Sequence, residues 1–329
     1  MTARRAAAEP GSAEPTATAR ALARLYDLDL VEDPGDVDLY LALATRTSGP
    51  ILELAAGTGR IAVPLTLGGH DVTAVDIDPA MLERAFARAR AVRGRDTHAG
   101  RGSRVGASAG ALELIEADLL DLDLPNAGAY RLALIALNSL FLLATRDAQR
   151  QAFRTLARHL APGGLAVVDV WLPEPDDLAR FDGRMIFEYE RREPETGHTV
   201  TKVAAARFDP TTAVVDLTAI YEEGPAGGTT IRWIRHDALR LVGADELRSM
   251  AEDAGLIVDE VGGDYDLEPI APGSERAIVI ARRPGRRPAR ATRQGAGPEV
   301  VADGSRPSGT YRPHASPDGL DTLGRDGIE

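Results

Sequence analysis

Apolar residues follow two alternating patterns along the chain between about residues 18 and 283. Apolar runs such as 132–137, which contains no polar residue, are typical of strands that are buried on both faces of a sheet. Between such runs, apolar residues recur every three or four positions; Ala152 and Leu156, for example, share one face of an amphipathic helix. Strands that alternate with helices predict βαβ units and a parallel sheet.

Seven runs are expected to be strands of this sheet, and five segments have helical spacing. The expected strands are 51–54, 72–75, 112–117, 132–137, 165–170, 257–261 and 277–281. The expected helices begin near residues 18, 61, 79, 148 and 247. We therefore expect an α/β fold in which a mostly parallel seven-stranded sheet has helices on both faces.

The pattern changes after the fifth expected strand, where polar and apolar residues begin to alternate one by one. Four such segments are separated by turn-forming residues: 185–191, 199–208, 213–222 and 229–235. Within the third segment, Val215 and Leu217 fall on one face, as the two-residue period of a strand requires. We expect residues 176–236 to form an antiparallel sheet inserted into the α/β core, which spans 18–175 and 237–283.

Both ends of the chain lack apolar periodicity. Residues 1–17 are rich in Ala, Pro, Glu and Thr, and residues 284–329 are rich in Gly, Pro, Arg, Ser and Asp. Segments with so little apolar content cannot bury enough surface to offset the entropy of ordering the chain. We expect both segments to be disordered tails.

Composition narrows the classes of function. The formal net charge of −12 would repel phosphate backbones, so nucleic acid is not expected as a partner. The absence of cysteine excludes disulfides, thiolate metal sites and a cysteine nucleophile. No stretch approaches the roughly 18 consecutive apolar residues that a transmembrane helix needs, so we expect a cytoplasmic protein without membrane contact.

The strongest chemical signal is the segment that follows the first expected strand, Glu53-Leu-Ala-Ala-Gly-Thr-Gly-Arg60. Gly57 and Gly59 allow a tight turn and the close approach of a ligand to the backbone, because they have no Cβ. The following helix N-terminus supplies unpaired N–H groups. A Gly-x-Gly turn can also simply end a strand, so this segment alone is a weak indication.

Two acidic residues strengthen the indication of a nucleotide-like ligand. Asp76 ends the second strand, 19 residues after Gly57, where an acid can accept hydrogen bonds from both ribose hydroxyls. Its alternative role is to cap the turn that Asp78 continues. Asp118 follows the third strand and could accept a hydrogen bond from an adenine amino group, or it could be a solvated loop residue.

Together these segments resemble those of the class I S-adenosylmethionine-dependent methyltransferases, over residues 20–283. The Pro162-Gly163-Gly164 turn before the fifth strand belongs to the same pattern. The resemblance implies a Rossmann-like fold, S-adenosylmethionine as cofactor, and methyl transfer. It implies cofactor contacts at Glu53, Ala55, Gly57, Thr58, Gly59, Arg60, Asp76, Ile77, Asp118, Leu119 and Asn138. Within that set, Glu53 would help to bind the methionyl ammonium.

The chain is most similar to family members with an inserted antiparallel sheet, which methylate small molecules. Because Rossmann-like sheets bind ligands beyond the carboxyl ends of their strands, we expect the insert to cover the acceptor pocket. The insert could equally form a homodimer contact, which is compatible with covering the pocket. The expected substrate-binding residues are Tyr26, Phe141, Trp171, Tyr221, Trp233 and Arg235. For Tyr26, packing within its helix is an equal alternative.

A general base is not evident. Leu142 stands where some relatives place a catalytic histidine, and His236 is the one histidine that could lie near a substrate, although a solvated strand end is its simpler interpretation. Tyr26, Asn138 and His236 are therefore weak catalytic candidates. We expect an amine acceptor, with a hydroxyl as the second choice, and an in-line transfer that relies on alignment. No histidine pair has metal-binding spacing, so no metal is expected.

Two other functions are compatible with the glycine turn. The segment Gly57–Ala62 also matches the dinucleotide motif G-x-G-x-x-A, which would indicate an NAD-dependent oxidoreductase. Glu53, Asp118 and the absence of a Tyr-x-x-x-Lys pair from the Rossmann part count against that activity. A non-catalytic scaffold of the same fold is the third possibility, and the intact set of Gly57, Gly59 and Asp76 counts against it.

Overall fold

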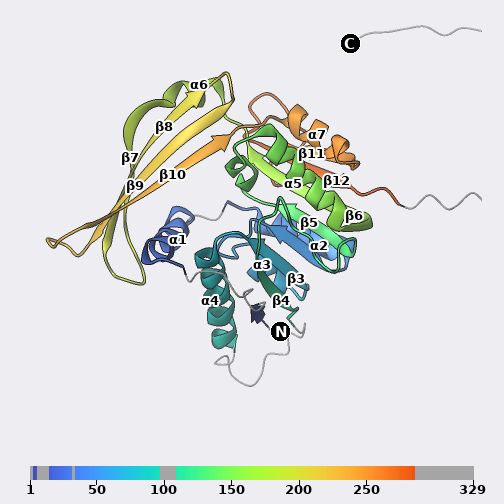
Figure 1. The fold of residues 1–329 in the computed structure, drawn as a ribbon, viewed down its shortest axis with the longest axis horizontal. Coiled ribbons are helices and arrows are strands. Elements are labelled where there is room, and N and C mark those ends of the chain that lie inside the picture. Colours follow the sequence, from blue (N-terminus) through green and yellow to red (C-terminus); the bar gives the residue numbers. More distant parts are fainter. Residues whose placement is uncertain (1–2, 6–14, 32–33, 97–108, 286–329) are drawn as a thin grey trace, which may run out of the picture. The chain divides into compact units, whose positions relative to one another are not determined.

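The main sheet of the computed structural model, which describes residues 3–5, 15–31, 34–96 and 109–285, has the strand order β1-β4-β3-β2-β5-β6-β12-β11 (Figure 1). These strands are β1 (Ala3–Arg5), β2 (Ile51–Leu54), β3 (Val72–Asp76), β4 (Leu112–Glu116), β5 (Tyr130–Ile135), β6 (Leu160–Trp171), β11 (Ile257–Gly262) and β12 (Arg276–Arg282). All neighbouring pairs are parallel except the two that involve β12. The mostly parallel sheet expected from the sequence is confirmed.

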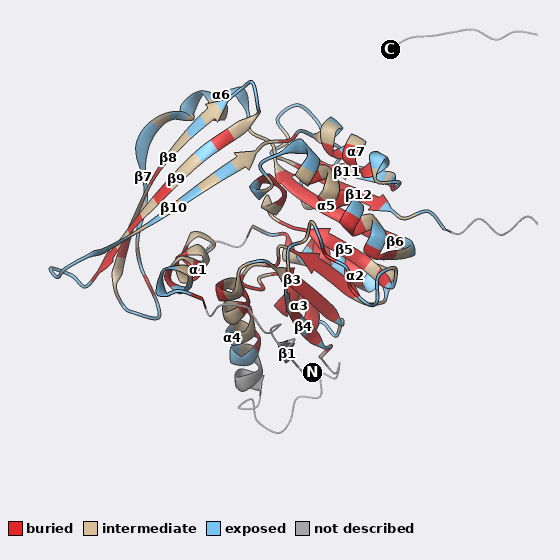
Figure 2. Cartoon of the chain, viewed as in Figure 1, coloured by how far each residue is buried: buried red, intermediate tan, exposed pale blue. Residues whose placement is uncertain are grey.

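Helices cover both faces of this sheet. Helices α2 (Val37–Thr47), α3 (Ala62–Leu67) and α4 (Pro79–Asp96) share one apolar core with the sheet, and α5 (Arg146–His159) and α7 (Ala244–Asp253) share the other. The strands at the centre are largely buried: all of β2 and the first four residues of β3 are buried, and Figure 2 shows β3 in red. Helix α2 is absent from the expected elements.

The second sheet, here called sheet B, contains β7 (Asp182–Arg192), β8 (Thr199–Asp209), β9 (Val214–Gly224) and β10 (Ile231–Arg240). All its pairings are antiparallel, in the order β10-β9-β8-β7, which confirms the inserted sheet. Helix α6 (Pro175–Arg180) joins it to β6. Strand β10 continues to Arg240, beyond the end expected at residue 235.

Helix α1 (Ala17–Asp29) lies between sheet B and the main sheet (Figure 1). Thr16 caps its first turn, because the Thr16 hydroxyl accepts a hydrogen bond from the Ala19 N–H at 3.1 Å. Leu25 and Leu28 on α1 pack with Val200 and Tyr221 on sheet B. The face of sheet B that meets α1 is called the inner face below.

The expected N-terminal tail needs a correction at residues 3–5. Ala3–Arg5 forms β1, which pairs in parallel with Leu112–Leu114 at the edge of the main sheet. An edge strand offers unpaired backbone groups, so this pairing needs no apolar pattern in the added segment. Other parts of the expected tails, residues 1–2, 6–14 and 286–329, lie outside the described residues.

Candidate active site

The segment between β2 and α3 forms a turn with an unusual backbone. Ala55, Gly57 and Gly59 have φ angles of 55°, 54° and 74°. Glycine accepts such positive φ angles without strain, whereas Ala55 does not. A Cβ on Gly59 would lie 2.9 Å from the Cβ of Ala85 on α4, so the turn packs tightly against that helix. On Gly57, by contrast, a Cβ would meet only the Tyr26 ring, at 3.9 Å, so the Gly57 backbone faces open space near Tyr26.

Asp76, at the end of β3, holds this turn through its carboxylate. Its Oδ2 accepts a hydrogen bond from the Gly57 N–H at 2.7 Å, and its Oδ1 accepts one from the Asp78 N–H at 2.9 Å. Burial raises the pKa of Asp76, and these backbone hydrogen bonds oppose that rise. The expected turn-capping role is therefore present in the structure. The ribose role stays a prediction.

Glu53 is a buried carboxyl group whose Oε2 has no hydrogen-bond partner. Burial raises its pKa to about 8; the nearby charges of Asp36 and Asp76 add to the rise, and that of Arg60 opposes it. Arg60 is itself engaged by the fully buried Asp36 through two hydrogen bonds of 2.5 and 2.7 Å. Glu53 thus lacks a cationic partner of its own. A buried polar atom without a hydrogen bond lowers the stability of the folded state.

One apolar residue, Ile77, and one acidic residue, Asp118, follow the carboxyl ends of β3 and β4. Ile77, next to Asp76, is 66% exposed, which is unusual for so large an apolar side chain. Asp118 is exposed, and its Oδ1 accepts a hydrogen bond from the Leu120 N–H at 2.8 Å. The backbone N–H of Ala117 donates to the carbonyl of Asp76 at 3.1 Å, which brings the Asp118–Leu119 turn next to Asp76.

A cavity of about 560 Å³ lies between sheet B, α1 and the carboxyl ends of β5 and β6. Five of the six expected substrate-binding residues line it: Tyr26, Phe141, Trp171, Tyr221 and Arg235. Asn138 also lines it; its Oδ1 accepts a hydrogen bond from the Trp171 N–H at 2.5 Å, and its φ of 65° places it in the left-handed region. The volume is within the range of cavities that hold small ligands.

Tyr26 stands where the cavity meets the glycine turn. It lines the cavity, and its Cε1 is the atom that faces Gly57. Burial raises the pKa of Tyr26, although the charges of Arg60 and Arg235 lower it in part. Its hydroxyl is therefore protonated near neutral pH. Tyr26 thus lies next to both the glycine turn and the cavity, in addition to its place in α1.

Two of the expected site residues, His236 and Trp233, do not line the cavity. His236 lies on the outer face of sheet B, exposed, with its Nδ1 3.0 Å from the Thr218 hydroxyl. Successive strand residues point to opposite faces, and it is Arg235 and Asp237 that line the cavity. Trp233 is on the inner face, but it packs at the α1 end of the sheet, with its Nε1 donating to Glu223 at 3.3 Å.

Several residues of the cavity wall were not expected from the sequence. Asp29 accepts hydrogen bonds from the hydroxyls of Tyr189 at 2.6 Å and Tyr221 at 2.8 Å. Lys202 pairs with Asp29 at 3.0 Å and with Glu188 at 2.8 Å. The available signal for Asp29 was its spacing of three residues from Tyr26, which places both on one side of a helix.

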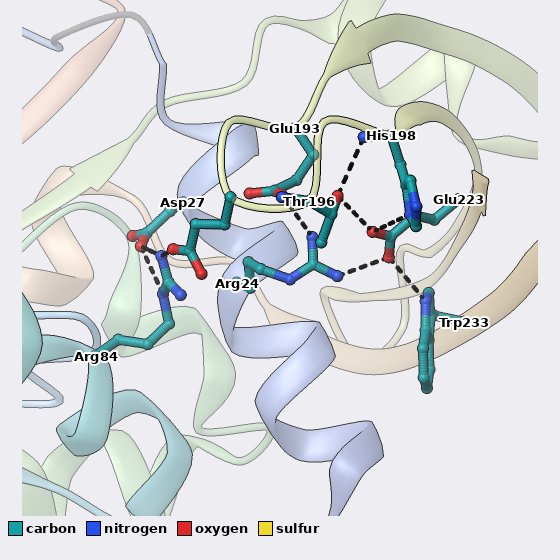
Figure 3. Close-up of polar contacts among 9 residues, drawn as sticks. Arg24, Asp27, Arg84, Glu193, Thr196, His198, Glu223 and Trp233 are labelled. Atoms are coloured by element: carbon teal, nitrogen blue, oxygen red, sulfur yellow. Dashed lines mark hydrogen bonds and ion pairs between the residues drawn. The ribbon is translucent and has the colours of Figure 1, made fainter. Parts of the chain in front are cut away.

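A polar network connects the end of sheet B that contains the β7–β8 turn to α1 (Figure 3). Arg24 of α1 pairs with Glu223 at 2.6 Å and with Glu193 at 3.2 Å, and the two carboxylates are almost fully buried. Glu223 also accepts a hydrogen bond from the Thr196 hydroxyl at 3.1 Å. These contacts connect the β7–β8 turn and β9 to α1.

A second set of ion pairs continues to the glycine turn. Arg84 of α4 pairs with Glu195 at 2.8 Å and with Asp27 at 2.7 Å (Figure 3). Asp27 in turn accepts a hydrogen bond from the Thr58 hydroxyl at 2.6 Å. A continuous chain of polar contacts therefore links the β7–β8 turn of sheet B to the turn that contains Gly57.

The described residues contain neither a cluster of metal-ligating side chains nor a membrane-spanning helix. Within residues 3–5, 15–31, 34–96 and 109–285, no group of three or more His, Asp or Glu side chains is placed to hold a metal ion. In the same ranges, no helix has both the length and the apolar content to cross a membrane.

Known proteins with similar sequences and folds include several methyltransferases. Residues 51–164 match a methyltransferase domain family. The cypemycin N-terminal methyltransferase of Streptomyces is 26% identical over 233 residues, which cover 71% of this chain and 82% of that protein. An S-adenosylmethionine-dependent methyltransferase structure from Clostridium acetobutylicum has a TM-score of 0.63 at 16% identity, and covers 80% of this chain and 98% of its own.

A sugar N-methyltransferase from Streptoalloteichus has a TM-score of 0.59 at 19% identity, and covers 85% of this chain and 97% of its own. Such identities between structures establish a shared fold. The domain match covers the strand, glycine turn and acidic strand ends described above, and the fold includes sheet B. Residues 51–164 therefore match a methyltransferase domain, and the chain shares the fold of S-adenosylmethionine-dependent methyltransferases.

Proposed function

We propose that this chain transfers the methyl group of S-adenosylmethionine to the amino group of a small molecule bound in the cavity under sheet B. The observation that carries the proposal is the position of Tyr26, which faces Gly57 on one side and the 560 Å³ cavity on the other. A cofactor held by the glycine turn and an acceptor held in the cavity would meet there.

The residues around the glycine turn fit the cofactor. Glu53 has a buried oxygen without a partner, which an ammonium group would satisfy. Gly57 leaves its backbone open to a ligand, and exposed Ile77 offers an apolar surface to a base. Asp76 would accept hydrogen bonds from the ribose hydroxyls. When bound, S-adenosylmethionine supplies a methyl group on a positively charged sulfur. Asp118 would accept from the adenine amino group.

The absence of a histidine from the cavity wall supports an amine acceptor. No histidine is among the described residues that line it, and His236 faces the opposite side of sheet B. A neutral amine needs no base at the transfer step. Its nitrogen lone pair forms the N–C bond in line with the breaking C–S bond, whose electrons stay on sulfur, and an ammonium product results. Tyr26 and Asn138 would orient the nitrogen, and alignment of this kind contributes about 7–11 kcal/mol.

The names of similar proteins support the same choice. The relative from Streptomyces is described as an N-terminal methyltransferase, and the structural neighbour from Streptoalloteichus as a sugar N-methyltransferase. An NAD-dependent reaction and a purely scaffolding role receive no comparable support.

A homodimer through sheet B stays part of the proposal. On the outer face, one apolar row crosses all four strands: Phe187, Val203, Ile220 and Ile234 are cross-strand neighbours. Phe187 is 61% exposed and Ile234 is 47% exposed. An apolar row without charges is complementary to itself, so a second copy of this chain can cover it by a two-fold contact. The cavity, on the inner face, would stay accessible.

Product analysis tests the reaction. The full-length protein would be incubated with S-adenosylmethionine and a panel of small amines, each paired with the alcohol of the same skeleton. We expect mass spectrometry to detect N-methylated products and S-adenosylhomocysteine, with no O-methylated product. Methylation of the alcohols alone would overturn the choice of an amine, and NADH-dependent turnover without methyl transfer would overturn the reaction itself.

A further inference from the structure

The charged side chains on the cavity wall do not balance. The wall carries four carboxylates and three cationic side chains. Two of the cations have one partner each, in the pairs Arg235–Asp237 at 2.7 Å and Arg180–Asp177 at 3.7 Å. Lys202 has two partners, Asp29 and Glu188, at 3.0 and 2.8 Å. One negative charge is therefore in excess, and it belongs to the group of Asp29, Glu188 and Lys202, here called the acidic pole.

The acidic pole is close to the transfer position and is rigidly held. Asp29 is three residues after Tyr26, so the two side chains leave α1 on the same side. The hydroxyls of Tyr189 and Tyr221 donate to the two carboxylate oxygens of Asp29 at 2.6 and 2.8 Å and fix its orientation. During transfer, positive charge moves from sulfur to the acceptor nitrogen. A fixed negative charge nearby stabilises that charge as it develops.

Most of the remaining cavity wall is apolar. Thirteen of the twenty-four lining residues are apolar. Ala204, Ala206 and Ala219 on the inner face of sheet B have short side chains, which leave space beneath the sheet. Leu142 and Ile186, also on the wall, are 47% and 52% exposed. An apolar ligand would cover these exposed side chains, whereas a polyhydroxylated ligand would leave its hydroxyls without partners against them.

We propose that the acceptor is an amine with a single positive charge on an extended apolar body. The ammonium lies against the acidic pole next to Tyr26, and the body extends beneath Ala204 and Ala206. It loses one proton to water before transfer and regains its charge as the N-methylated product. This inference rests on the proposed N-methylation and narrows it to one substrate class.

Binding of three probes tests the charge and the apolar body separately. Calorimetry with saturating S-adenosylhomocysteine would compare 4-phenylbutylamine, 4-phenylbutanol and glucosamine. We expect 4-phenylbutylamine to bind at least about tenfold more tightly than either other probe, because the alcohol lacks the charge and glucosamine lacks the apolar body. Equal or tighter binding of glucosamine, or no binding of 4-phenylbutylamine, would overturn the proposed class.

Asp29→Asn tests the acidic pole, with Asp216→Asn as its control, because Asp216 is exposed on β9 between the inward-facing Val215 and Leu217. We expect Asp29→Asn to weaken binding of 4-phenylbutylamine about ten- to a hundredfold and to leave 4-phenylbutanol within about twofold. Unchanged binding of the amine would refute the role of the pole. Retained S-adenosylhomocysteine binding would show that the variant is folded.

Ala206→Phe tests the space beneath sheet B. Its control is Ala205→Phe, because Ala205 is the next residue on β8 and points to the outer face. We expect only Ala206→Phe to weaken 4-phenylbutylamine binding, by about tenfold or more. Equal effects of the two changes would refute the position of the body. Methylation of glucosamine but not of 4-phenylbutylamine would overturn the substrate class and preserve N-methylation, whereas the absence of any N-methylated product would overturn both.

Discussion

Glu53 gives a sharp test of the site, because its carboxyl group is buried with one oxygen lacking a hydrogen-bond partner and its pKa is raised to about 8. In the unfolded chain this carboxyl ionises near its ordinary pKa of 4.5. Between pH 4.5 and 8, the carboxyl group therefore keeps its proton in the folded state and has lost it in the unfolded state. Stability from this group is fully present below about pH 4.5, and it is lost as the pH rises towards 8.

Glu53→Gln removes this titration and keeps the shape of the side chain. Each pKa unit corresponds to about 1.4 kcal/mol, so the free energy of unfolding of the wild type should fall relative to the variant by about 1.4 kcal/mol per pH unit between pH 5 and 8. Urea unfolding of both proteins at several pH values measures the difference. Glu113→Gln, at an exposed position of β4, is the control and should show no such trend.

The same proton should appear in cofactor binding. If the methionyl ammonium pairs with ionised Glu53, the carboxyl group must lose its proton when the ligand binds. At pH 6.5 almost every Glu53 is protonated, whereas an α-amino group, with a pKa of about 7.7–8.0, keeps its charge. Binding of S-adenosylhomocysteine at pH 6.5 should therefore release close to one proton.

Calorimetry in buffers with different ionisation enthalpies measures this release. Glu53→Gln should bind more weakly and release no proton, and Glu113→Gln should behave as the wild type does. A wild type that binds without releasing a proton would refute the contact between Glu53 and the ammonium. A Glu53→Gln variant with unchanged affinity would refute it independently.

Three further outcomes follow from the structure. Asp76→Ala should weaken S-adenosylhomocysteine binding by about 1–3 kcal/mol in calorimetry, through the ribose contact and the lost hydrogen bond to Gly57, and normal affinity would contradict both. His236→Ala should leave kcat/KM and its ascending pH limb unchanged, whereas a loss of about 10²–10⁴-fold would make it a base. Phe187→Glu should convert a dimer into a monomer in analytical ultracentrifugation; a wild-type monomer would exclude the outer-face contact.

The sequence predicts the parts of the fold that depend on local pattern. Mostly apolar runs identify the seven longer strands of the main sheet, because strands covered on both faces are largely apolar. The one-by-one alternation in residues 213–222 likewise identifies the inner face of β9, including Leu217 and Tyr221, which line the cavity. The glycine turn and Asp76 are neighbours in space, as their spacing suggested.

Features that depend on partners distant in the sequence are not predicted. Helix α2 follows Asp36, whose carboxylate pairs with Arg60, and nothing near Asp36 in the sequence indicates that pair. Asp29 likewise joins the cavity through Tyr189 and Tyr221, which are distant in the sequence. For His236 the expected strand was too short: β10 continues to Arg240, and its alternation turns His236 outwards.

Helix α1 explains how one short segment can serve both halves of the site. Asp27 binds the Thr58 hydroxyl at the glycine turn, Tyr26 faces Gly57 and the cavity, and Asp29 binds two tyrosines of sheet B. A shift of α1 would therefore change the proposed cofactor site and the proposed acceptor site together. Arg84 limits such a shift, because it connects Asp27 to the β7–β8 turn. In the proposed reaction, the spacing of these acids along one helix would fix the distance between donor and acceptor, on which an in-line transfer depends.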